Sequence, residues 1–447
     1  MGTRRVVIIG GGFAGLTAGV RLSELGHEVL VLERRGHLGG RAYSFIDSKT
    51  GDVVDNGQHL FMGCYHHTIA FLKTIGRLDR LKFQERPRVD FLDSAHGFTS
   101  FDCPPLPAPL HVLAGLFRMK GLAFGDKLRA LNLRRAIGRN GKHSPDLLTV
   151  EQWLDQLKQS DNIKTRFWNP MVIATLNQSP DIASARMLKV VLQEAFGGDS
   201  KSANIGISSV GLSDLYTDGA AGFIKSKGGD VQTGAQVQRL IIEDRRARAV
   251  ELKDGERIEA DYFISAVPPA ALFSILPVGL RSHEFASLEK LGSSPIVSIN
   301  LWFDRPVIDR EFVGLLGTRC QWIFNKDAIM ANEKSSNHIA VIISAAQDFV
   351  DWTRNDLVNM AMGDLHEVLP ESRSANLLHS NIVKEREATL SHTVESDKLR
   401  LGPRTSIANL ILAGDWTDTG LPATIESAVM SGDVAADSVF YQPFTRG

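Results

Sequence analysis

The sequence is poor in cysteine and contains no long apolar run. Its three cysteines, Cys64, Cys103 and Cys320, are widely separated and form no Cys-x-x-Cys pair, which argues against a disulfide framework and against a zinc site. No run of 18 apolar residues occurs, so the sequence predicts no membrane-spanning helix. The formal net charge is -1, whereas chains that bind nucleic acid carry a basic excess. These features predict no metal site and no nucleic-acid partner.

The length of the chain predicts two domains. It has 447 residues, and a single hydrophobic core stops growing at about 250–300 residues. The apolar run that follows Arg4 and Arg5 is cut short by three glycines, so it indicates a strand rather than a signal peptide. Because cysteine is scarce as well, we expect a reducing, cytoplasmic location.

The N-terminal region predicts a strand–helix–strand unit. Residues 6–9 form a short apolar run, typical of a strand buried on both faces. The next residues match G-x-G-x-x-G, residues 16–25 keep helical spacing, and a second strand is expected over 28–33. A glycine motif framed in this way predicts dinucleotide binding. The residues expected to bind are Gly10, Gly12, Phe13, Ala14, Gly15 and Glu33.

Each position of this motif has a physical role. Gly10 permits a tight turn, Gly12 lets a pyrophosphate approach the backbone, and Gly15 seats the helix against the strand. The helix N-terminus offers free N–H groups and the positive end of the helix dipole. Glu33 follows Gly15 by 18 residues, where an acidic side chain accepts a hydrogen bond from a ribose hydroxyl.

The residues after Glu33 narrow the choice of dinucleotide. The run RRGHLGGRAYS places Gly39, Gly40 and Arg41 after a short loop, and in this it resembles the flavoprotein amine oxidase and phytoene desaturase superfamily. The resemblance implies FAD as the cofactor, with Arg34 and the Gly-Gly-Arg among its contacts and Arg41 at the diphosphate. A guanidinium suits a phosphate because it is a fixed fork of donors.

The C-terminal region carries a second set of matching residues. NLILAGDWTDTGLPATIESAVMSG predicts a buried strand over 410–413, then Gly414 and Asp415, a loop and a helix. The resemblance implies that this aspartate meets the ribityl chain or the diphosphate. It also places the backbone of Thr424 and Ile425 at the pyrimidine edge of the flavin. A helix N-terminus stabilises the negative charge that reduced flavin carries there.

Both chain ends are therefore assigned to one domain. Residues 231–267 predict a third piece of it, with strands over 237–243 and 249–253 and a hairpin turn at Asp254-Gly255, and the resemblance places the Val237 backbone beside the adenine. The predicted fold is α/β: a Rossmann-like FAD-binding domain of the glutathione-reductase type, assembled from discontinuous segments, with an α+β substrate domain. The FAD-binding domain is predicted at 1–75, 205–270 and 395–447, and the substrate domain at 76–204 and 271–394.

The substrate domain is predicted to mix helices with strands. LTVEQWLDQL begins with Thr149 as an N-cap candidate, with Gln152 three residues later. Further along, strands are expected over 296–303 and 339–344, and a helix over 353–369.

Segment 104–139 combines an apolar front with a basic remainder. Residues 106–117 are mostly apolar, and the seven lysines and arginines of 118–139 face only Asp126, which gives a local charge of +6. Apolar residues beside a basic face describe a helix that lies in a membrane interface. In that case the protein would be peripheral on the inner face of the cytoplasmic membrane. The alternative is a substrate-domain helix with a solvated charged face, and composition does not decide between the two.

A polar stretch, DNGQH at 55–59, is followed at once by apolar residues. The resemblance places this stretch under the flavin ring, so that its hydrogen bonds would find partners in FAD. Gly57 would permit close backbone approach, and Gln58 would contact the cofactor. Residues 60–62 would line the way into the reaction cavity. The alternative is an Asn-Gly turn between two strands, with Gln58 and His59 in solvent.

Longer runs narrow the resemblance. VVDNGQHLFMGCYHHT, with LGGRAYSF before it and AGDWTDTGLPATIESAVMSG far downstream, is similar to the hydroxysqualene dehydroxylase family, the squalene-associated, FAD-dependent branch of bacterial hopanoid synthesis. The similarity extends over the whole chain. Amine oxidases tend to have an aromatic residue at the position of Thr424, because an amine cation needs a π face. The threonine therefore favours polyisoprenoid chemistry and an isoprenoid lipid substrate.

The resemblance implies that the hydroxyl of hydroxysqualene is replaced by hydrogen to give squalene, with hydride from N5 of the reduced flavin. Such a reaction needs a dry, apolar tunnel and one proton donor near the leaving oxygen. His59 and Tyr65 are candidates for the donor, and a water or the flavin itself are alternatives. Two other functions stay open: a phytoene-type desaturase, and a non-catalytic isoprenoid-binding protein of the same fold. The sequence indicates neither the electron donor nor the oligomeric state.

Overall fold

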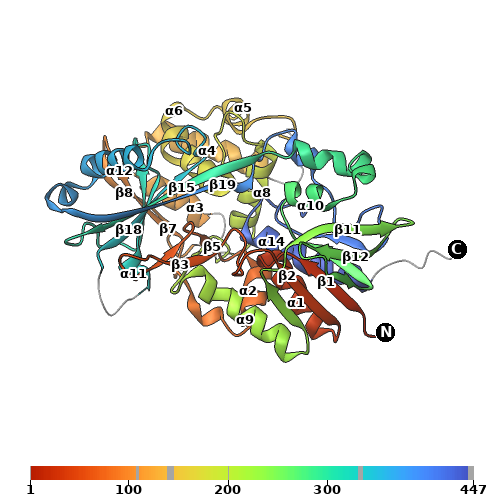
Figure 1. Cartoon of the computed structure of the whole chain (residues 1–447). Coiled ribbons are helices and arrows are strands. Elements are labelled where there is room, and N and C mark those ends of the chain that lie inside the picture. Colours follow the sequence, from red (N-terminus) through yellow and green to blue (C-terminus); the bar gives the residue numbers. More distant parts are fainter. Residues whose placement is uncertain (1, 107–109, 138–144, 200, 331–335, 441–447) are drawn as a thin grey trace.

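A five-stranded parallel sheet joins the two ends of the chain to its middle (Figure 1). The computed structural model describes residues 2–106, 110–137, 145–199, 201–330 and 336–440. In spatial order the strands are β10 (Asp230–Thr233), β2 (Glu28–Glu33), β1 (Arg5–Ile9), β14 (Tyr262–Ser265) and β20 (Leu410–Leu412). Val6, Val7 and Ile8 are fully buried in the middle of this sheet, as expected of a strand that is covered on both faces.

One face of the sheet is covered by helices. α1 (Phe13–Glu24) follows β1, and both α14 (Ile425–Phe440) and α9 (Leu212–Ser226) pack against α1. The backbones of α1 and α14 come close together at Gly432, where an added Cβ would lie 2.4 Å from the Ala14 carbonyl oxygen. The α14 helix, which ends the described chain, is thereby fixed against the first helix.

A second, antiparallel sheet covers the opposite face. It consists of β11 (Val237–Glu243), β12 (Arg246–Leu252) and β13 (Arg257–Glu259). Val6 and Ile8 belong to the core beneath the helices, whereas Val7 and Ile9 belong to the core beneath this sheet. Successive side chains of a strand point to opposite faces, which explains why β1 is apolar without alternation.

The substrate domain is built on a seven-stranded sheet. In spatial order its strands are β19 (Leu377–Leu390), β15 (Ser293–Phe303), β18 (His338–Ser344), β17 (Trp322–Asn325), β16 (Phe312–Leu316), β7 (Arg88–Asp93) and β8 (Gly97–Asp102). Neighbouring strands are antiparallel except for β16 and β7. α12 (Arg354–Val368) buries Leu357 and Leu365 in the same core as Val297.

Helices of the first substrate segment pack beside β8. They are α3 (Leu110–Arg118), α4 (Phe124–Ile137), α5 (Val150–Gln156), α6 (Asp161–Ile163), α7 (Asn169–Leu176) and α8 (Ala185–Phe196). The predicted start of α5 is confirmed, because the Thr149 hydroxyl accepts from the Gln152 N–H and the Gln152 side chain accepts from the Thr149 N–H. This reciprocal pair is a capping box. Trp153 is fully buried in the core that these helices share with β8.

Short elements join the two large sheets or link strands within them. They are β3 (Ser44–Ile46), β4 (Val53–Asp55), β5 (Leu60–Met62), α2 (His66–Thr74), β6 (Leu81–Phe83), β9 (Ile205–Ser208), α10 (Pro269–Ile275), α11 (Lys326–Met330) and α13 (Ser396–Leu399). β3 and β4 form a hairpin, and β5 and β6 both pair with β9. The chain thus passes from the parallel sheet to the seven-stranded sheet through the β3–β4 hairpin.

The predicted fold class is confirmed, although some strands begin up to three residues before their predicted start. β12 begins at Arg246 rather than at residue 249, because Asp244 and Arg245 both have positive φ, 47° and 56°. Two such residues make a two-residue hairpin turn, and neither is the glycine that usually marks one. The domain boundaries themselves stay a prediction.

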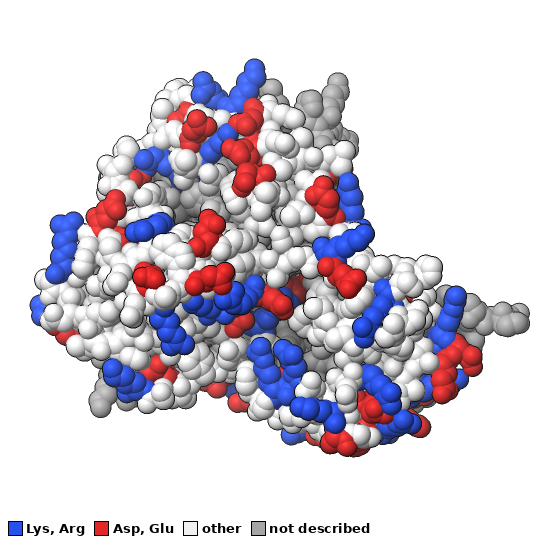
Figure 2. All heavy atoms as spheres, turned by 45° about the horizontal axis from the view of Figure 1, so that its top comes forward, with Lys and Arg blue, Asp and Glu red and all other residues white. Residues whose placement is uncertain are grey.

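The surface carries charges of both signs. Figure 2 shows lysine and arginine side chains interspersed with aspartate and glutamate over the visible face. Within the described ranges, none of the helices combines the length and the apolar character that crossing a membrane requires.

Candidate active site

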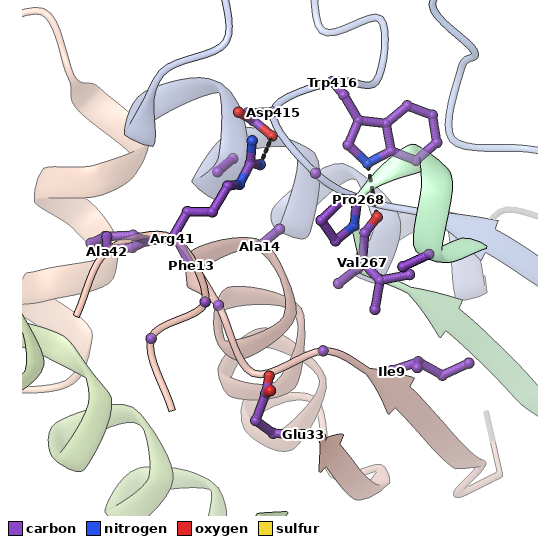
Figure 3. A pocket seen from close by; sticks show the side chains of 18 of the residues that line it. Ile9, Phe13, Ala14, Glu33, Arg41, Ala42, Val267, Pro268, Asp415 and Trp416 are labelled. Atoms are coloured by element: carbon purple, nitrogen blue, oxygen red, sulfur yellow. Dashed lines mark hydrogen bonds and ion pairs between the residues drawn. The ribbon is translucent and has the colours of Figure 1, made fainter. Parts of the chain in front are cut away.

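A groove lies at the carboxyl ends of β1, β2 and β14, bounded by the residues that both chain ends contribute. Figure 3 shows Phe13 and Ala14 at the start of α1, with Glu33 on one side and Asp415 and Trp416 on the other. α1 begins here without a side-chain cap on its first N–H groups. Such a helix N-terminus is suited to hold a phosphate.

Glu33 is fixed at the end of β2. Its Oε2 accepts from the Gly11 N–H at 2.9 Å and its Oε1 from the Arg35 N–H at 2.8 Å. The residue is only 6% exposed, yet it lines the groove. Two backbone donors therefore hold the carboxylate, and each oxygen keeps a lone pair for a ligand hydroxyl.

The glycines of the motif differ in what surrounds them. Gly10 has a φ of 110°, a conformation that favours glycine. A Cβ on Gly15 would lie 2.0 Å from the Gly10 carbonyl oxygen, so Gly15 permits helix–strand packing and sits behind the groove. A Cβ on Gly12 would meet its nearest atoms, in Gly39 and Gly40, only at 3.8–3.9 Å. The space in front of Gly12 and the acceptor at Glu33 fit a dinucleotide.

Arg41 and Asp415 meet across the groove although 374 residues separate them. Figure 3 shows the guanidinium pointing at the carboxylate, and the Arg41 Nη2 donates to the Asp415 Oδ1. The Asp415 side chain is 7% exposed and the Arg41 side chain 31%. The guanidinium therefore keeps N–H groups available toward the groove.

Two aromatic residues for which the sequence predicts no role support the groove. Trp416 is buried and donates from its Nε1 to the Val267 carbonyl at 3.0 Å (Figure 3). Tyr216 stacks on Phe13 with ring centroids 3.6 Å apart. The Tyr216 hydroxyl donates a hydrogen bond to the Gly39 carbonyl oxygen at 2.8 Å. Tyr216 comes from α9, and the sequence around it has no feature that distinguishes it from a core residue.

Residues 55–58 of the polar stretch find partners inside the protein, which corrects the expectation that FAD would supply them. Asp55 accepts from the Lys326 ammonium at 2.9 Å and from the Leu212 N–H at 3.0 Å. The Asn56 side chain bonds the backbone of Tyr43 and Arg41. Burial by itself would raise the pKa of Asp55, but the ammonium and the hydrogen bonds outweigh it and hold that pKa below its ordinary value.

Gly57 and Gln58 also differ from their predicted role. Both lie outside the described lining of the groove. The Gln58 Oε1 accepts from Lys326 at 2.9 Å, and the Gly57 carbonyl accepts from the His59 Nδ1 at 2.9 Å. Lys326 was not anticipated as a partner, because it lies 271 residues beyond Asp55 in sequence.

His59 lines the groove, but the proton of its neutral ring lies on Nδ1, which donates to the protein backbone instead of to a ligand. Because Nδ1 donates to the Gly57 carbonyl, the neutral ring presents Nε2 as an acceptor. Burial, the largest effect, lowers the pKa of His59, so the neutral form is favoured at pH 7. This geometry makes His59 a hydrogen-bond acceptor toward the groove rather than a proton donor.

A second, larger cavity of about 670 Å³ adjoins the groove. Thr424 lines both. The walls of the cavity are mostly apolar and come from β5, α7, α8, the seven-stranded sheet and the loop before α14. Apolar lining residues include Leu60, Phe61, Met62, Val89, Phe91, Phe101, Phe167, Met171, Val191, Ile205, Trp322 and Leu421. Its size is that of a ligand pocket, and Leu60–Met62 lie in its wall as expected.

Tyr65 lies in this cavity, next to the groove. It lines the cavity together with Thr424, whose side chain influences the pKa of the phenol. Burial raises the pKa of Tyr65, so the phenol keeps its proton. Glu426, two residues after Thr424, accepts from the N–H groups of His67 and Thr68 at 2.8 and 2.9 Å and so fixes the start of α2 beside Tyr65.

The structure gathers most of the predicted site residues in the groove and separates four of them from it. Gly15 lies behind it, Gly57 and Gln58 lie outside its described lining, and Tyr65 lies in the apolar cavity. The predicted residues that line the groove are Gly10, Gly12, Phe13, Ala14, Glu33, Arg34, Gly39, Gly40, Arg41, His59, Val237, Gly414, Asp415, Thr424 and Ile425.

Comparisons with known proteins agree with this geometry. A family model described as flavin containing amine oxidoreductase matches residues 13–440. Hydroxysqualene dehydroxylase of Rhodopseudomonas palustris is 32% identical over 98% of this chain and 98% of its own length. The 15-cis-phytoene desaturase of Synechococcus elongatus is 26% identical over 97% of this chain and 95% of its own. Among solved structures, an oxidoreductase from Methanosarcina mazei covers 98% of this chain and 100% of its own with a TM-score of 0.75 and 19% identity, which shows the shared fold.

Proposed function

Because the chain belongs to the flavin-containing amine oxidoreductase family and is an FAD-dependent oxidoreductase, we propose that it removes the hydroxyl of hydroxysqualene reductively to give squalene. The observation that carries this proposal is the apolar cavity of about 670 Å³ that meets the groove at Thr424. An elongated isoprenoid would place one carbon at this junction and bury its chain against aliphatic and aromatic side chains. The similarity to hydroxysqualene dehydroxylase over almost the whole chain supports the same substrate.

The groove would hold FAD through residues from both chain ends. Glu33 would accept from the ribose, the start of α1 and Arg41 would face the diphosphate, and the N-terminus of α14 would face the flavin ring. Reduced flavin supplies hydride when it is bound. The choice of FAD follows from the family, and the individual contacts are part of the proposal.

The remaining requirements of the reaction fall to side chains of the cavity. Replacing a hydroxyl by hydride needs one proton, which leaves with the oxygen as water. Tyr65 is the donor we assign, because its phenol keeps its proton and lies beside Thr424 where the two cavities meet. The apolar walls exclude bulk water from this position, which strengthens the polar contacts that are made there.

The direction of the reaction is tested with the FAD-loaded protein. When chemically reduced without oxygen, it is expected to convert hydroxysqualene to squalene, and deuterium carried by the reduced flavin should appear at one central carbon. Tyr65→Phe should slow this conversion about 100-fold, the usual effect of a positioned proton donor, with FAD content unchanged. His59→Gln should stay within about tenfold of the wild type, because the ring acts as an acceptor.

The opposite result would identify the desaturase alternative. If the reduced protein leaves hydroxysqualene unchanged, and the oxidised protein inserts double bonds into phytoene, dehydroxylation is wrong. The similarity to a phytoene desaturase makes this the appropriate second substrate. If neither substrate reacts with a fully FAD-loaded protein, the proposed substrate class is wrong as well.

A membrane surface is proposed as the place where the substrate is collected. α3 buries Leu116 and α4 buries Ala130 in the core, yet their outer face is also apolar. Its exposed residues, which we name the α3–α4 patch, are Leu110, Phe117, Phe124 and Leu128. They are flanked by Arg118, Lys120, Lys127 and Arg129. Residues 107–109 and 138–139 of the predicted interface segment lie outside the described residues.

The patch matches the chemistry of an anionic bilayer. The Phe117 and Phe124 rings lie 6.1 Å apart, and Phe124 is 67% exposed. Large apolar side chains that cluster on a surface mark an interaction site. A basic rim adds attraction to anionic lipid headgroups. Together they favour a peripheral protein whose isoprenoid substrate enters from the bilayer.

A further inference from the structure

The loop from Asp415 to Ala423 leads into α14. Two side chains of the preceding segment 392–400, those of His392 and Arg400, hold this loop. Arg400 donates to four carbonyls of this loop, those of Asp415, Trp416, Thr417 and Leu421. Arg400 is only 6% exposed. A guanidinium has five N–H donors in a fixed plane, so it can fix several carbonyls at once. Four carbonyls of the loop are thereby satisfied by one side chain.

The N–H group at the end of the loop, that of Ala423, has a separate partner. The Ala423 N–H donates to the His392 Nε2 at 2.7 Å. The other ring nitrogen, Nδ1, lies 3.2 Å from the Asp397 Oδ1, and the Asp397 Oδ2 accepts from the Ser184 hydroxyl at 2.7 Å. His392 is 1% exposed. Because Nε2 accepts, Nδ1 carries the proton and donates it to Asp397, so a single tautomer satisfies all four groups.

The turn at Ala423 and Thr424 forms the wall between the groove and the apolar cavity. Ala423, Thr424 and Ile425 line the groove, and Leu421 and Thr424 line the apolar cavity. Ser184, at the other end of the relay, precedes α8, whose side chains line the same cavity. The relay thus joins the helix that shapes the substrate cavity to the turn at which the groove begins.

We propose that His392, oriented by Asp397, is a positioning residue that fixes the turn at Ala423 and Thr424 between the cofactor groove and the substrate cavity. The proposal rests on the proposed function in that it takes the turn to face the flavin. His392 itself lines neither the groove nor the cavity and acts through the Ala423 backbone. Without this acceptor, the buried N–H would lose its partner, and the turn would shift to find another.

The electrostatics of the relay agree with this role. Burial, the largest effect, lowers the pKa of His392, and the Arg400 guanidinium acts in the same direction. Asp397 on α13 and Asp415 at the start of the loop oppose it. The imidazole is therefore neutral at pH 7, as the Ala423 hydrogen bond requires. If Nε2 were protonated at acid pH, its N–H would face the Ala423 N–H. The hydrogen bond between them would be lost, and the turn would be released.

Two variants with side-chain amides distinguish the positioning role of His392 from simple packing. His392→Gln can place an oxygen near the position of Nε2, whereas His392→Asn has no atom there. Hydrogen exchange of the Ala423 amide is measured in the protein with FAD and without substrate. We expect His392→Asn to exchange about tenfold faster or more, the effect of one lost buried hydrogen bond, and to show a shifted visible flavin spectrum. His392→Gln is expected to restore both.

Acid pH supplies the second readout. Protection of the Ala423 amide should fall as the pH drops in the wild type, whereas it should stay constant in His392→Gln, which has no group to titrate. His379→Asn is the control, because His379 also pairs with an aspartate, Asp47, at the β3–β4 hairpin. That variant should leave Ala423 protection unchanged.

The proposal is overturned if His392→Asn leaves Ala423 protected, or if His392→Gln loses protection to the same extent, since the ring would then act only by filling space. Should His392→Asn not fold, the pH dependence of the wild type against His392→Gln decides. Exchange needs no turnover, so a protein that fails to reduce hydroxysqualene can still show the relay.

Discussion

At the scale of single residues, Asp55 and Lys326 form an ion pair that is almost completely buried between β4 and α11. Their side chains are 5% and 3% exposed and their charged atoms lie 2.9 Å apart. Further hydrogen bonds from Ser44 and Leu212 complete the Asp55 carboxylate. Removing one member of such a pair leaves an uncompensated buried charge. The pair therefore holds the polar stretch beneath the groove in one arrangement.

Asp55→Asn is expected to lower the free energy of unfolding at pH 7 by about 3–5 kcal/mol, because Lys326 would be left without its counter-charge. The pKa of Asp55 is lowered in the folded state. Its contribution is therefore present above the unfolded carboxyl pKa of about 3.9 and is lost as the pH falls through the folded value. Urea unfolding of the FAD-free protein at pH 7, 5 and 3.5 measures this, and the difference between wild type and variant should shrink at the lowest pH.

Asp161→Asn is the control for this prediction, since the Asp161 side chain is 98% exposed. It should change the free energy of unfolding by less than about 0.5 kcal/mol. Lys326→Met combined with Asp55→Asn should cost less than the two single changes added together, because no unpaired charge remains. Equal stability of Asp55→Asn and wild type at pH 7 would contradict the assignment of a stabilising pair.

At the scale of elements, the contact between α1 and α14 determines where two helix N-termini meet the groove. Gly432 permits this contact, because a Cβ there would lie 2.4 Å from the Ala14 carbonyl oxygen and 2.9 Å from the Thr17 Cβ. The backbone of α1 cannot yield without moving the glycine loop that precedes it. Helix packing and cofactor binding are thus coupled through one glycine.

Gly432→Ala is expected to lower the free energy of unfolding by about 1–3 kcal/mol, the usual cost of overpacking, and to weaken FAD binding as well. Gly363→Ala is the matched control within α12, because an added Cβ there meets open space among the described residues. That change should raise stability by up to about 1 kcal/mol through helix propensity. Thermal unfolding and FAD titration of both variants test this prediction. If Gly432→Ala changes neither stability nor FAD binding, the two helices can separate at little cost.

At the scale of the whole molecule, the groove, the apolar cavity and the α3–α4 patch form one arrangement. Phe101 and Phe167 line the cavity and also belong to the core against which α3 and α4 pack. The patch on α3 and α4 therefore lies on the exposed side of helices whose buried side chains belong to the core that lines the cavity. A lipid substrate would then have a short route from a membrane to the junction at Thr424.

Vesicle flotation tests this arrangement. The wild type should bind vesicles that contain anionic lipid, and high salt should weaken binding because the basic rim is screened. Phe117→Ser combined with Phe124→Ser should reduce binding at least tenfold, since two aromatic side chains lose their apolar contact. Trp352→Ser is the control, because Trp352 is 38% exposed outside the patch. Equal binding by both variants would refute the patch as the contact surface.

The sequence by itself determined the features that depend on neighbouring residues. The glycine loop, the helix after it and Glu33 follow one another within 33 residues, and their spacing alone predicts where they lie. The strand and the Gly-Asp pair before α14 are equally local. Hydrophobic periodicity and the Thr149 cap identified several substrate-domain elements for the same reason: a helix or strand is specified by its own residues.

Only the tertiary structure decided which distant side chains meet. Lys326 reaches Asp55 across 271 residues, and His392 reaches the Ala423 N–H from a separate loop. A buried polar group takes whichever partner the packing brings within hydrogen-bond distance, and no periodicity of the sequence encodes that choice. For this reason the sequence predicts that the polar stretch at 55–59 faces FAD, whereas the fold satisfies its carboxylate with a lysine that is distant in the chain.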